Sequence, residues 1–263
     1  MKPIIAIASA TVGEAIRRKV LLVILFVGVL FVGFAPGLSV LSARQERSVL
    51  IGMTLGIIQL TSAVIAIVLT VYLLPNEIER RTIYTILCKP VERWQFLLGK
   101  YFGAVSALGV MMALMTGVLI IVFAIQQGEY SVDGLAILAR APAMYFIQMS
   151  LLAAVAICFS TFVTPLVNFF LSGGLYLVGS LFATFFETMQ SNPSTPAFAK
   201  GFATLINTIL PNFSLFNVQN PIINPGQQIQ SEGAYYLTAT GYGVVYIAAM
   251  LILGMLVFQK REV

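Results

Sequence analysis

"VLLVILFVGVLFVGF", residues 20–34, consists entirely of apolar residues and glycines, with no charged or hydrogen-bonding side chain. A helix that crosses a membrane needs about 20 mostly apolar residues, and this run supplies most of one. Because lipid offers no partners for backbone N–H and C=O groups, only helices and closed barrels can span a bilayer. The run lacks the apolar and polar alternation of a barrel strand, so it predicts a membrane-spanning helix.

Similar apolar runs recur through the rest of the chain, which has 263 residues, of which 59% are hydrophobic and 10% charged. Its mean hydropathy is +0.95, and a soluble domain would carry about 25% charged residues. We therefore predict an all-α integral membrane protein, with residues 1–263 forming a single transmembrane domain. The six predicted spans are residues 20–41, 49–74, 96–125, 142–164, 166–186 and 235–258.

The basic residues predict which way the chain is oriented in the membrane. Cytoplasmic loops carry an excess of Lys and Arg, and with both termini in the cytoplasm eleven of the 15 basic residues lie on that side. We therefore expect a multi-pass protein of the cell inner membrane. The net charge of +5 then reflects topology and contact with anionic lipid headgroups, and we expect no binding to nucleic acid.

Residues 3–19 precede the first span and have the pattern of an amphipathic helix. One arc of this helix is mostly apolar and the other is polar, as expected for a helix in the membrane interface. The apolar arc holds Ile4, Ile5, Ala8, Val12, Ala15 and Ile16, and the polar arc holds Ser9, Gly13, Glu14 and Arg17. Two roles remain open for this helix: an anchor only, or a part of the mechanism.

A few polar residues lie deep in the predicted spans. Polar side chains are costly in lipid, so they should face other helices or a cavity. Hydrogen bonding between helices is one interpretation, and the lining of a substrate pathway is the other. The candidate pathway residues are Gln59, Thr61, Ser62, Gln148 and Asn168.

The longest stretch between spans is residues 187–234, on the outer side in this topology. Apolar residues recur there at helical spacing, which predicts an amphipathic helix on the outer leaflet. This apolar face consists of Phe198, Phe202, Leu205, Ile206 and Ile209.

"NEIERRTIYTILCKPVERWQ", residues 76–95, carries seven of the 25 charged residues and connects the second and third spans. A cap at Asn76 and the proline after Lys89 predict a cytoplasmic helix of about three turns. A polar connection that only satisfies topology would need Lys and Arg but not Glu77 or Glu79. Interleaved charges of both signs favour a surface that docks on another protein.

Extended to "NEIERRTIYTILCKPVERWQFLLGKYFG", this stretch resembles the first cytoplasmic connection of ABC-2 type transporter permeases. In that family a charged helix leads through Thr, Leu and a Lys-Pro-Val turn to a Leu-Gly-Lys start of the third span. The N-terminal amphipathic helix, the six spans and an outer segment containing "LPNFSLFN" also resemble the family.

The resemblance implies that residues 77–88 form a coupling helix, which seats in a cleft of a cytoplasmic ABC ATPase. It further assigns roles to individual residues in this connection. By this analogy the ATPase is contacted by Glu77, Glu79, Arg80, Arg81 and Thr82. The turn beneath the third span is shaped by Lys89, Pro90 and Arg93.

The source of energy should lie outside this chain. The sequence has no G-x-x-x-x-G-K-[ST] phosphate loop, and no ionisable residue deep in a span offers an obvious proton or ion relay. The sequence shows no pairing of a nucleophile with a base and no set of metal ligands. Cys88 lies in the predicted cytoplasmic connection and Cys158 inside the predicted fourth span, so we expect no structural disulfide between them. We therefore expect no enzyme activity and no bound cofactor, with ATP and Mg on the partner ATPase.

The leading hypothesis is the permease subunit of an ABC transporter, paired with a second copy or a similar permease and with two ATPase copies. The family resemblance favours export. A second hypothesis is an ABC membrane subunit that transmits force or assembles cell-envelope machinery without moving a solute. A channel or secondary carrier is a third, and only this one would remain active without an ATPase.

Overall fold

The computed structural model consists of helices and their connections throughout the part of the chain that it describes. Described are residues 2–39, 46–75, 92–127, 132–182, 188–189, 196, 198–201, 204, 210–218 and 232–260. The α-helices are α1 (Lys2–Arg17), α2 (Lys19–Ser39), α3 (Glu46–Val71), α6 (Arg93–Gln127), α7 (Val132–Ser160), α8 (Pro165–Leu177) and α12 (Glu232–Lys260). A π-helix, η1 (Val178–Phe182), continues α8, and a 3₁₀-helix, η2 (Phe213–Phe216), lies in the outer segment. The predicted all-α class is confirmed for these residues.

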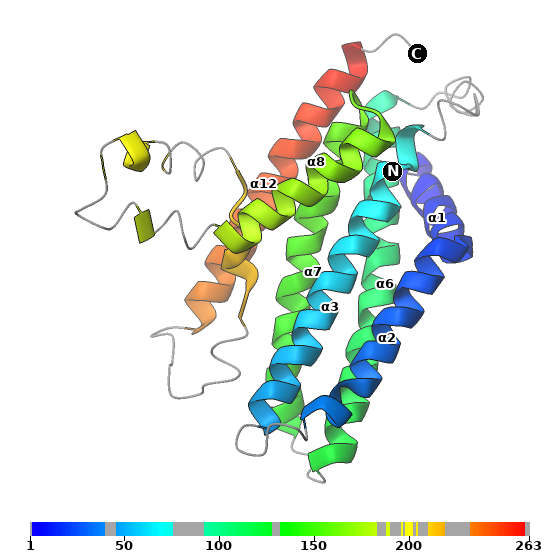
Figure 1. Ribbon diagram of the computed structural model, residues 1–263. Coiled ribbons are helices and arrows are strands. Elements are labelled where there is room, and N and C mark those ends of the chain that lie inside the picture. The colour runs from blue at the N-terminus through cyan, green and yellow to red at the C-terminus, as the bar shows by residue number, and fades with distance from the viewer. Residues whose placement is uncertain are drawn as a thin grey trace.

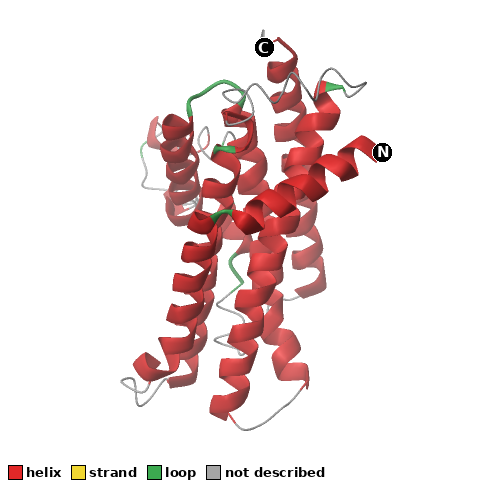
Figure 2. Ribbon diagram, turned by 90° about the vertical axis from the view of Figure 1, so that its right-hand side faces the viewer, coloured by secondary structure: helices red, strands yellow, loops and turns green. Residues whose placement is uncertain are grey.

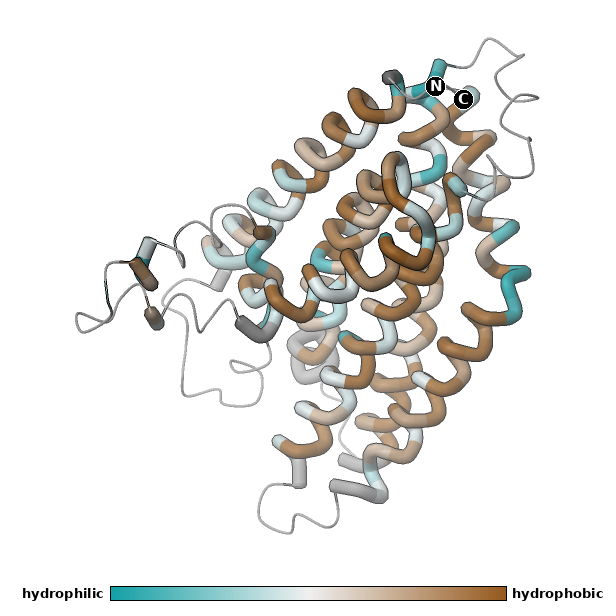
Figure 3. Tube along the Cα trace, turned by 45° about the horizontal axis from the view of Figure 1, so that its top comes forward, coloured by the Kyte–Doolittle hydropathy of each residue, from teal (hydrophilic) through white to brown (hydrophobic). Residues whose placement is uncertain are grey.

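The long helices α2, α3, α6 and α7 lie side by side, and α12 packs against α7 (Figure 1). Both chain termini lie at the same end of this bundle, which we call the terminal end. Hydrophobic residues cover most of the length of the long helices (Figure 3). This is the distribution expected of helices whose outer surfaces face hydrocarbon.

Within the described residues, five helical stretches are long and apolar enough to cross a membrane. They are Lys19–Gly37, Ser48–Pro75, Arg93–Ile125, Leu138–Ser160 and Gly233–Gln259. They correspond to the predicted spans one, two, three, four and six. The largest difference is in span four, because α7 begins ten residues before position 142 and Pro142 lies inside the helix.

The segment predicted as span five is shorter than the others in the described residues. Its apolar helix covers Pro165–Ser180, and residues 183–187 lie outside the described part of the chain. Pro165 stands at the first turn, where its missing N–H costs nothing. The helix leaves the terminal end at an oblique angle to α7 (Figure 1). A sixth crossing stays a prediction.

Helix α7 lies at the centre of the bundle. Within its span window 78% of the residues are buried, against 22% in the windows of α2 and α12. The contiguous residues 151–158 are all buried. The helices α2 and α12 therefore expose most of their apolar side chains, which lipid tails can solvate as well as protein can.

Residues 210–218, in the predicted outer segment, fold back onto the bundle. Phe213 and Phe216 are fully buried, and η2 contacts both α7 and η1. A Cβ atom added at Gly179 would lie 2.5 Å from the Pro211 carbonyl oxygen, so only glycine permits this approach. The helix predicted from the apolar face of residues 198–209 falls mostly outside the described residues, although residues 198–201 are helical.

Candidate functional site

The predicted docking segment leaves and re-enters the bundle at the terminal end. Its residues Glu77, Glu79, Arg80, Arg81, Thr82, Lys89 and Pro90 lie outside the described residues, so their roles stay predictions. The flanking helices are described: α3 and its last turn run to Pro75, and α6 starts at Arg93. These two helix ends lie near both chain termini (Figure 1). Any force on residues 76–91 therefore reaches the bundle at this end.

Arg93, at the start of α6, is bonded to the end of α12. Its Nη1 atom donates hydrogen bonds to the carbonyl oxygens of Phe258 and Gln259, both at 3.2 Å. The guanidinium carbon lies 5.9 Å from the centroid of the Phe258 ring. Because the last carbonyls of a helix have no partner within it and carry partial negative charge, a cation there is stabilising.

Lys100, two turns further along α6, interacts with α1. Its Nζ atom lies 3.9 Å from Oε2 of Glu14 and 5.7 Å from the centroid of the Phe96 ring. The other carboxylate oxygen, Oε1, accepts a hydrogen bond of 2.6 Å from Arg18. The Lys100 side chain is only 6% exposed, so this ammonium group is largely desolvated at the α1 and α6 contact. A buried cation requires such compensation.

Two glycines of α6 let α1 approach closely. A Cβ atom at Gly99 would lie 2.8 Å from the Ile7 Cβ, and one at Gly103 would lie 2.6 Å from the Thr11 Cβ. Figure 2 shows α1 crossing the long helices obliquely. The spacing is G-x-x-x-G, which typically brings two membrane helices into contact. The signal for this contact is present in the sequence as "GKYFG", residues 99–103.

The helix predicted at residues 3–19 is present as α1, but it ends at Arg17, and Lys19 already begins α2. One side of α1 packs on protein. Ile7 and Thr11 lie against the two α6 glycines and Ala15 is buried, whereas Ile5 and Ile16 are exposed. We call the contacts of Glu14, Arg93, Lys100 and Phe258 the terminal junction. It joins α1, α6 and α12 directly beside the predicted docking segment.

Two of the candidate pathway residues are bonded to each other. Gln59 of α3 donates from Nε2 to the Oε1 atom of Gln148 in α7, at 3.2 Å. Gln148 in turn donates to the carbonyl oxygen of Phe213 in η2, at 3.0 Å. This chain of amides joins two spans to the outer segment, which is the interhelical interpretation of these residues.

The three other candidate residues do not join this pair. A Cβ atom at Gly28 of α2 would lie 2.6 Å from Thr61 Cγ2, so Thr61 marks a close contact between α2 and α3. Ser62 is fully buried, and its hydroxyl has no hydrogen-bond partner within the described part of the chain. Asn168 of α8 donates to the Ala156 carbonyl oxygen at 2.9 Å. A common pathway lined by all five stays a prediction.

Sequence reasoning missed the anchoring of the outer segment. Tyr235 of α12 donates to the Leu215 carbonyl oxygen at 2.6 Å, and the Asn212 N–H donates to the Tyr242 hydroxyl at 3.0 Å. The available signal was the pair of aromatic residues in "NFSLF" followed by the tyrosines of "AYYLTATGYG". Buried tyrosines normally find a hydrogen-bond partner, but a sequence does not say which one.

The described residues contain no group of three or more His, Cys, Asp or Glu that could hold a metal ion. No curated protein matches the chain. A family model described as "ABC-2 family transporter protein" matches residues 5–263, which is nearly the whole chain and includes the docking segment and the terminal junction. The chain thus belongs to the ABC-2 family of transporter membrane proteins.

Proposed function

We propose that this chain is the membrane-spanning permease subunit of an ATP-driven ABC exporter. The observation that carries the proposal is the family match over residues 5–263, together with five apolar helices of membrane-spanning length. Permeases of this family pair with a cytoplasmic ABC ATPase. ATP and Mg would therefore be bound by that separate subunit, and this chain would convert ATPase movement into movement of its spans.

Residues 77–88 are the coupling helix in this proposal. They lie between the span that ends at Pro75 and the span that begins at Arg93, so a movement of the segment acts on two spans at once. The mixed charges of the segment suit docking on a protein surface. The ATPase contacts would come from Glu77, Glu79, Arg80, Arg81 and Thr82.

The terminal junction supports this proposal because it gives the force a defined path. Arg93 lies near the end of the docking segment and is bonded to the last carbonyls of α12. Lys100 and the glycine contacts tie the same end of α6 to α1. Displacement of α6 would therefore carry α1 and α12 with it, and α1 would take part in the mechanism.

A second permease copy completes the transporter in this proposal. The bundle has five described spans and one shorter helix, which is few for an enclosed pathway, and two facing bundles would form one. We place the homodimer in the cell inner membrane with both termini in the cytoplasm. Lipid headgroups would surround Arg17 and Lys19, which are both exposed at the junction of α1 and α2.

The docking role is tested by reversing two neighbouring charges, Glu79→Lys with Arg80→Glu. We expect the double variant to insert normally but to lose its ATPase, measured as ATP hydrolysis that co-purifies with the permease in mild detergent. The matched control reverses the adjacent pair Glu46 and Arg47, at the opposite end of α3, and should keep the ATPase. Full recovery of ATPase with the docking variant would refute the proposed role.

The orientation is tested separately by labelling a cysteine at position 9. The Ser9 side chain is exposed on α1, so Ser9→Cys in a chain without Cys88 and Cys158 gives one accessible thiol. An impermeant maleimide should label it in inside-out vesicles and not in intact cells. Labelling in intact cells would overturn the proposed topology without touching the docking test.

A further inference from the structure

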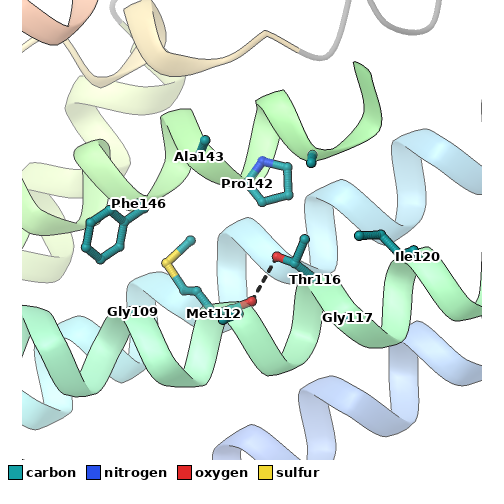
Figure 4. A pocket seen from close by; sticks show the side chains of 10 residues that line it. Gly109, Met112, Thr116, Gly117, Ile120, Pro142, Ala143 and Phe146 are labelled. Atoms are coloured by element: carbon teal, nitrogen blue, oxygen red, sulfur yellow. Dashed lines mark hydrogen bonds between the residues drawn. The ribbon is translucent and has the colours of Figure 1, made fainter. Parts of the chain in front are cut away.

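An open groove lies between α6 and α7, away from the terminal junction. Its volume is about 460 Å³. Figure 4 shows the residues of the two helices that face it. The α6 side is lined by Gly109, Met112, Ala113, Thr116, Gly117 and Ile120, and the α7 side by Ala139, Pro142, Ala143 and Phe146.

The lining offers hydrocarbon and almost no polar chemistry. Thr116 carries the one side-chain hydroxyl in it, and this hydroxyl donates to the Met112 carbonyl oxygen of its own helix at 2.8 Å. Ala143 is exposed although it stands in the middle of the α7 side. A ligand in the groove would therefore gain dispersion and hydrophobic contacts and would find no charged partner inside it.

The groove is about as long as one leaflet of a bilayer is deep. The rise along α6 from Gly109 to Ile120 corresponds to about 16 Å at 1.5 Å per residue. The hydrocarbon core of a bilayer is about 30 Å thick, so the groove matches the depth of one leaflet. Because α6 runs from the terminal end towards Gln127, this is the leaflet farthest from the two chain termini.

Arg140 lies at one end of the groove, where the headgroup of a bound lipid would be. Arg140 directly follows the lining residue Ala139, its side chain is exposed, and it stands two positions inside the apolar stretch that begins at Leu138. Long basic side chains at this depth extend towards the interface. A guanidinium there can form charge-assisted hydrogen bonds to a phosphate group.

We propose that the groove binds one acyl chain of a phospholipid from the leaflet remote from the termini, with the lipid phosphate beside Arg140. The length of the groove, its apolar lining and the position of the cation all fit this ligand. A spanning helix of a second copy would pack over about 30 Å, twice the length available here. The proposal holds whether or not residues 77–88 dock on an ATPase.

The first test uses the unaltered full-length protein in nanodiscs of phosphatidylethanolamine and phosphatidylglycerol. A phosphatidylglycerol with a diazirine at the middle of one acyl chain is added, photolysed, and its attachment sites are mapped by mass spectrometry. We expect labelling in residues 109–120 and 139–146 at least about threefold above the lipid-facing stretch 244–257 of α12. Equal labelling of all three stretches would overturn the proposal.

The second test fills the groove. Ala143→Phe should lower the phosphatidylglycerol retained in native mass spectrometry about tenfold, because the phenyl ring occupies the space of the acyl chain. The matched control, Ala249→Phe on the exposed face of α12, should retain the lipid. Arg140→Gln should weaken retention about fivefold, as expected for one cation at an anionic surface.

These experiments distinguish a bound lipid from a second copy of the chain in the groove. Loss of lipid with Ala143→Phe alone supports the site, whereas equal retention by both phenylalanine variants refutes it. If Ala143→Phe converts a dimer to a monomer and leaves lipid retention unchanged, the groove is a contact for a second copy and the proposal is wrong. The photolabelling experiment uses the unaltered protein, so it tests lipid binding in the groove even if a variant does not fold.

Discussion

The contact between Arg93 and the end of α12 gives a quantitative prediction. Replacing Arg93 by alanine removes two hydrogen bonds of 3.2 Å to the Phe258 and Gln259 carbonyl oxygens. It also removes the cation that lies 5.9 Å from the Phe258 ring centroid. The last turn of α12 then has fewer partners, while its packing through the Phe258 ring against Phe96, at 6.4 Å between centroids, remains.

The size of the effect follows from the geometry. A hydrogen bond to a charged group contributes about 1.5–3 kcal/mol, and a cation at a helix C-terminus contributes about 0.3–1 kcal/mol. These contributions overlap here because one guanidinium makes both, and 3.2 Å is at the long end for such bonds. For this partly exposed group we expect a loss of about 1.5 kcal/mol, which is about tenfold in the local opening equilibrium.

Hydrogen exchange of the full-length protein in nanodiscs measures that equilibrium directly. With Arg93→Ala, the amides of residues 255–260 should exchange about tenfold faster. Arg93→Lys should give a smaller change, because it keeps the charge and loses the planar pair of donors. Arg17→Ala is the control, since Arg17 is an exposed basic residue of α1, and it should leave these amides unchanged.

Two results would refute this reasoning. One is unchanged exchange at the end of α12 in Arg93→Ala, which would mean that the two hydrogen bonds contribute nothing to the junction. The other is the same acceleration in Arg17→Ala, which would show a general effect of charge at the membrane surface. Either result would also weaken the path by which the docking segment is proposed to move α12.

Three other contacts give predictions of similar kind. Gly103→Val should lower the free energy of unfolding by about 2 kcal/mol, because the larger side chain displaces α1 at Thr11. The N-terminus should then be cleaved faster by a protease, whereas Gly33→Val, at a position in open space, should leave the cleavage rate unchanged. Equal cleavage of both variants would contradict the close contact. Gln148→Leu should lower the free energy of unfolding by about 1 kcal/mol, and an unchanged thermal transition would show that the amide chain is not needed. Asn168→Leu should lower the free energy of unfolding by a similar amount in the same assay. A more stable variant would show that the hydrogen bond from Asn168 to the Ala156 carbonyl oxygen does not stabilise the packing of α8 on α7.

The membrane-spanning helices could be predicted from sequence because their cause is local. Residues 20–34 form most of α2, since an apolar run of that length satisfies its backbone in lipid by forming a helix. The helix at residues 3–19 could be predicted from its periodicity, because that pattern is also carried within the segment. The predicted fourth span begins at position 142, whereas α7 begins at Val132 and continues through Pro142.

The assignment of residues 77–88 as the docking segment comes from the sequence alone. Its mixed charges, its position between two spans and its resemblance to the family predict a coupling helix at residues 77–88, which lie outside the described residues. The family match over residues 5–263 includes this segment and shows the family of the chain, while the docking role stays a prediction. Which charges touch an ATPase depends on the partner surface, and no pattern within this chain encodes it.

Hydropathy and periodicity determine that these segments are helices in a membrane, because both properties are carried within each segment. They do not determine which helices touch, since every spanning helix is similarly apolar and lipid tails solvate each of them equally well. Only the folded chain brings Gln59 to Gln148, 89 residues away, and Arg93 to the end of α12, 165 residues away. Those pairings depend on side-chain shape and hydrogen-bond geometry between distant segments, so the terminal junction and the groove between α6 and α7 emerge only at the level of tertiary packing.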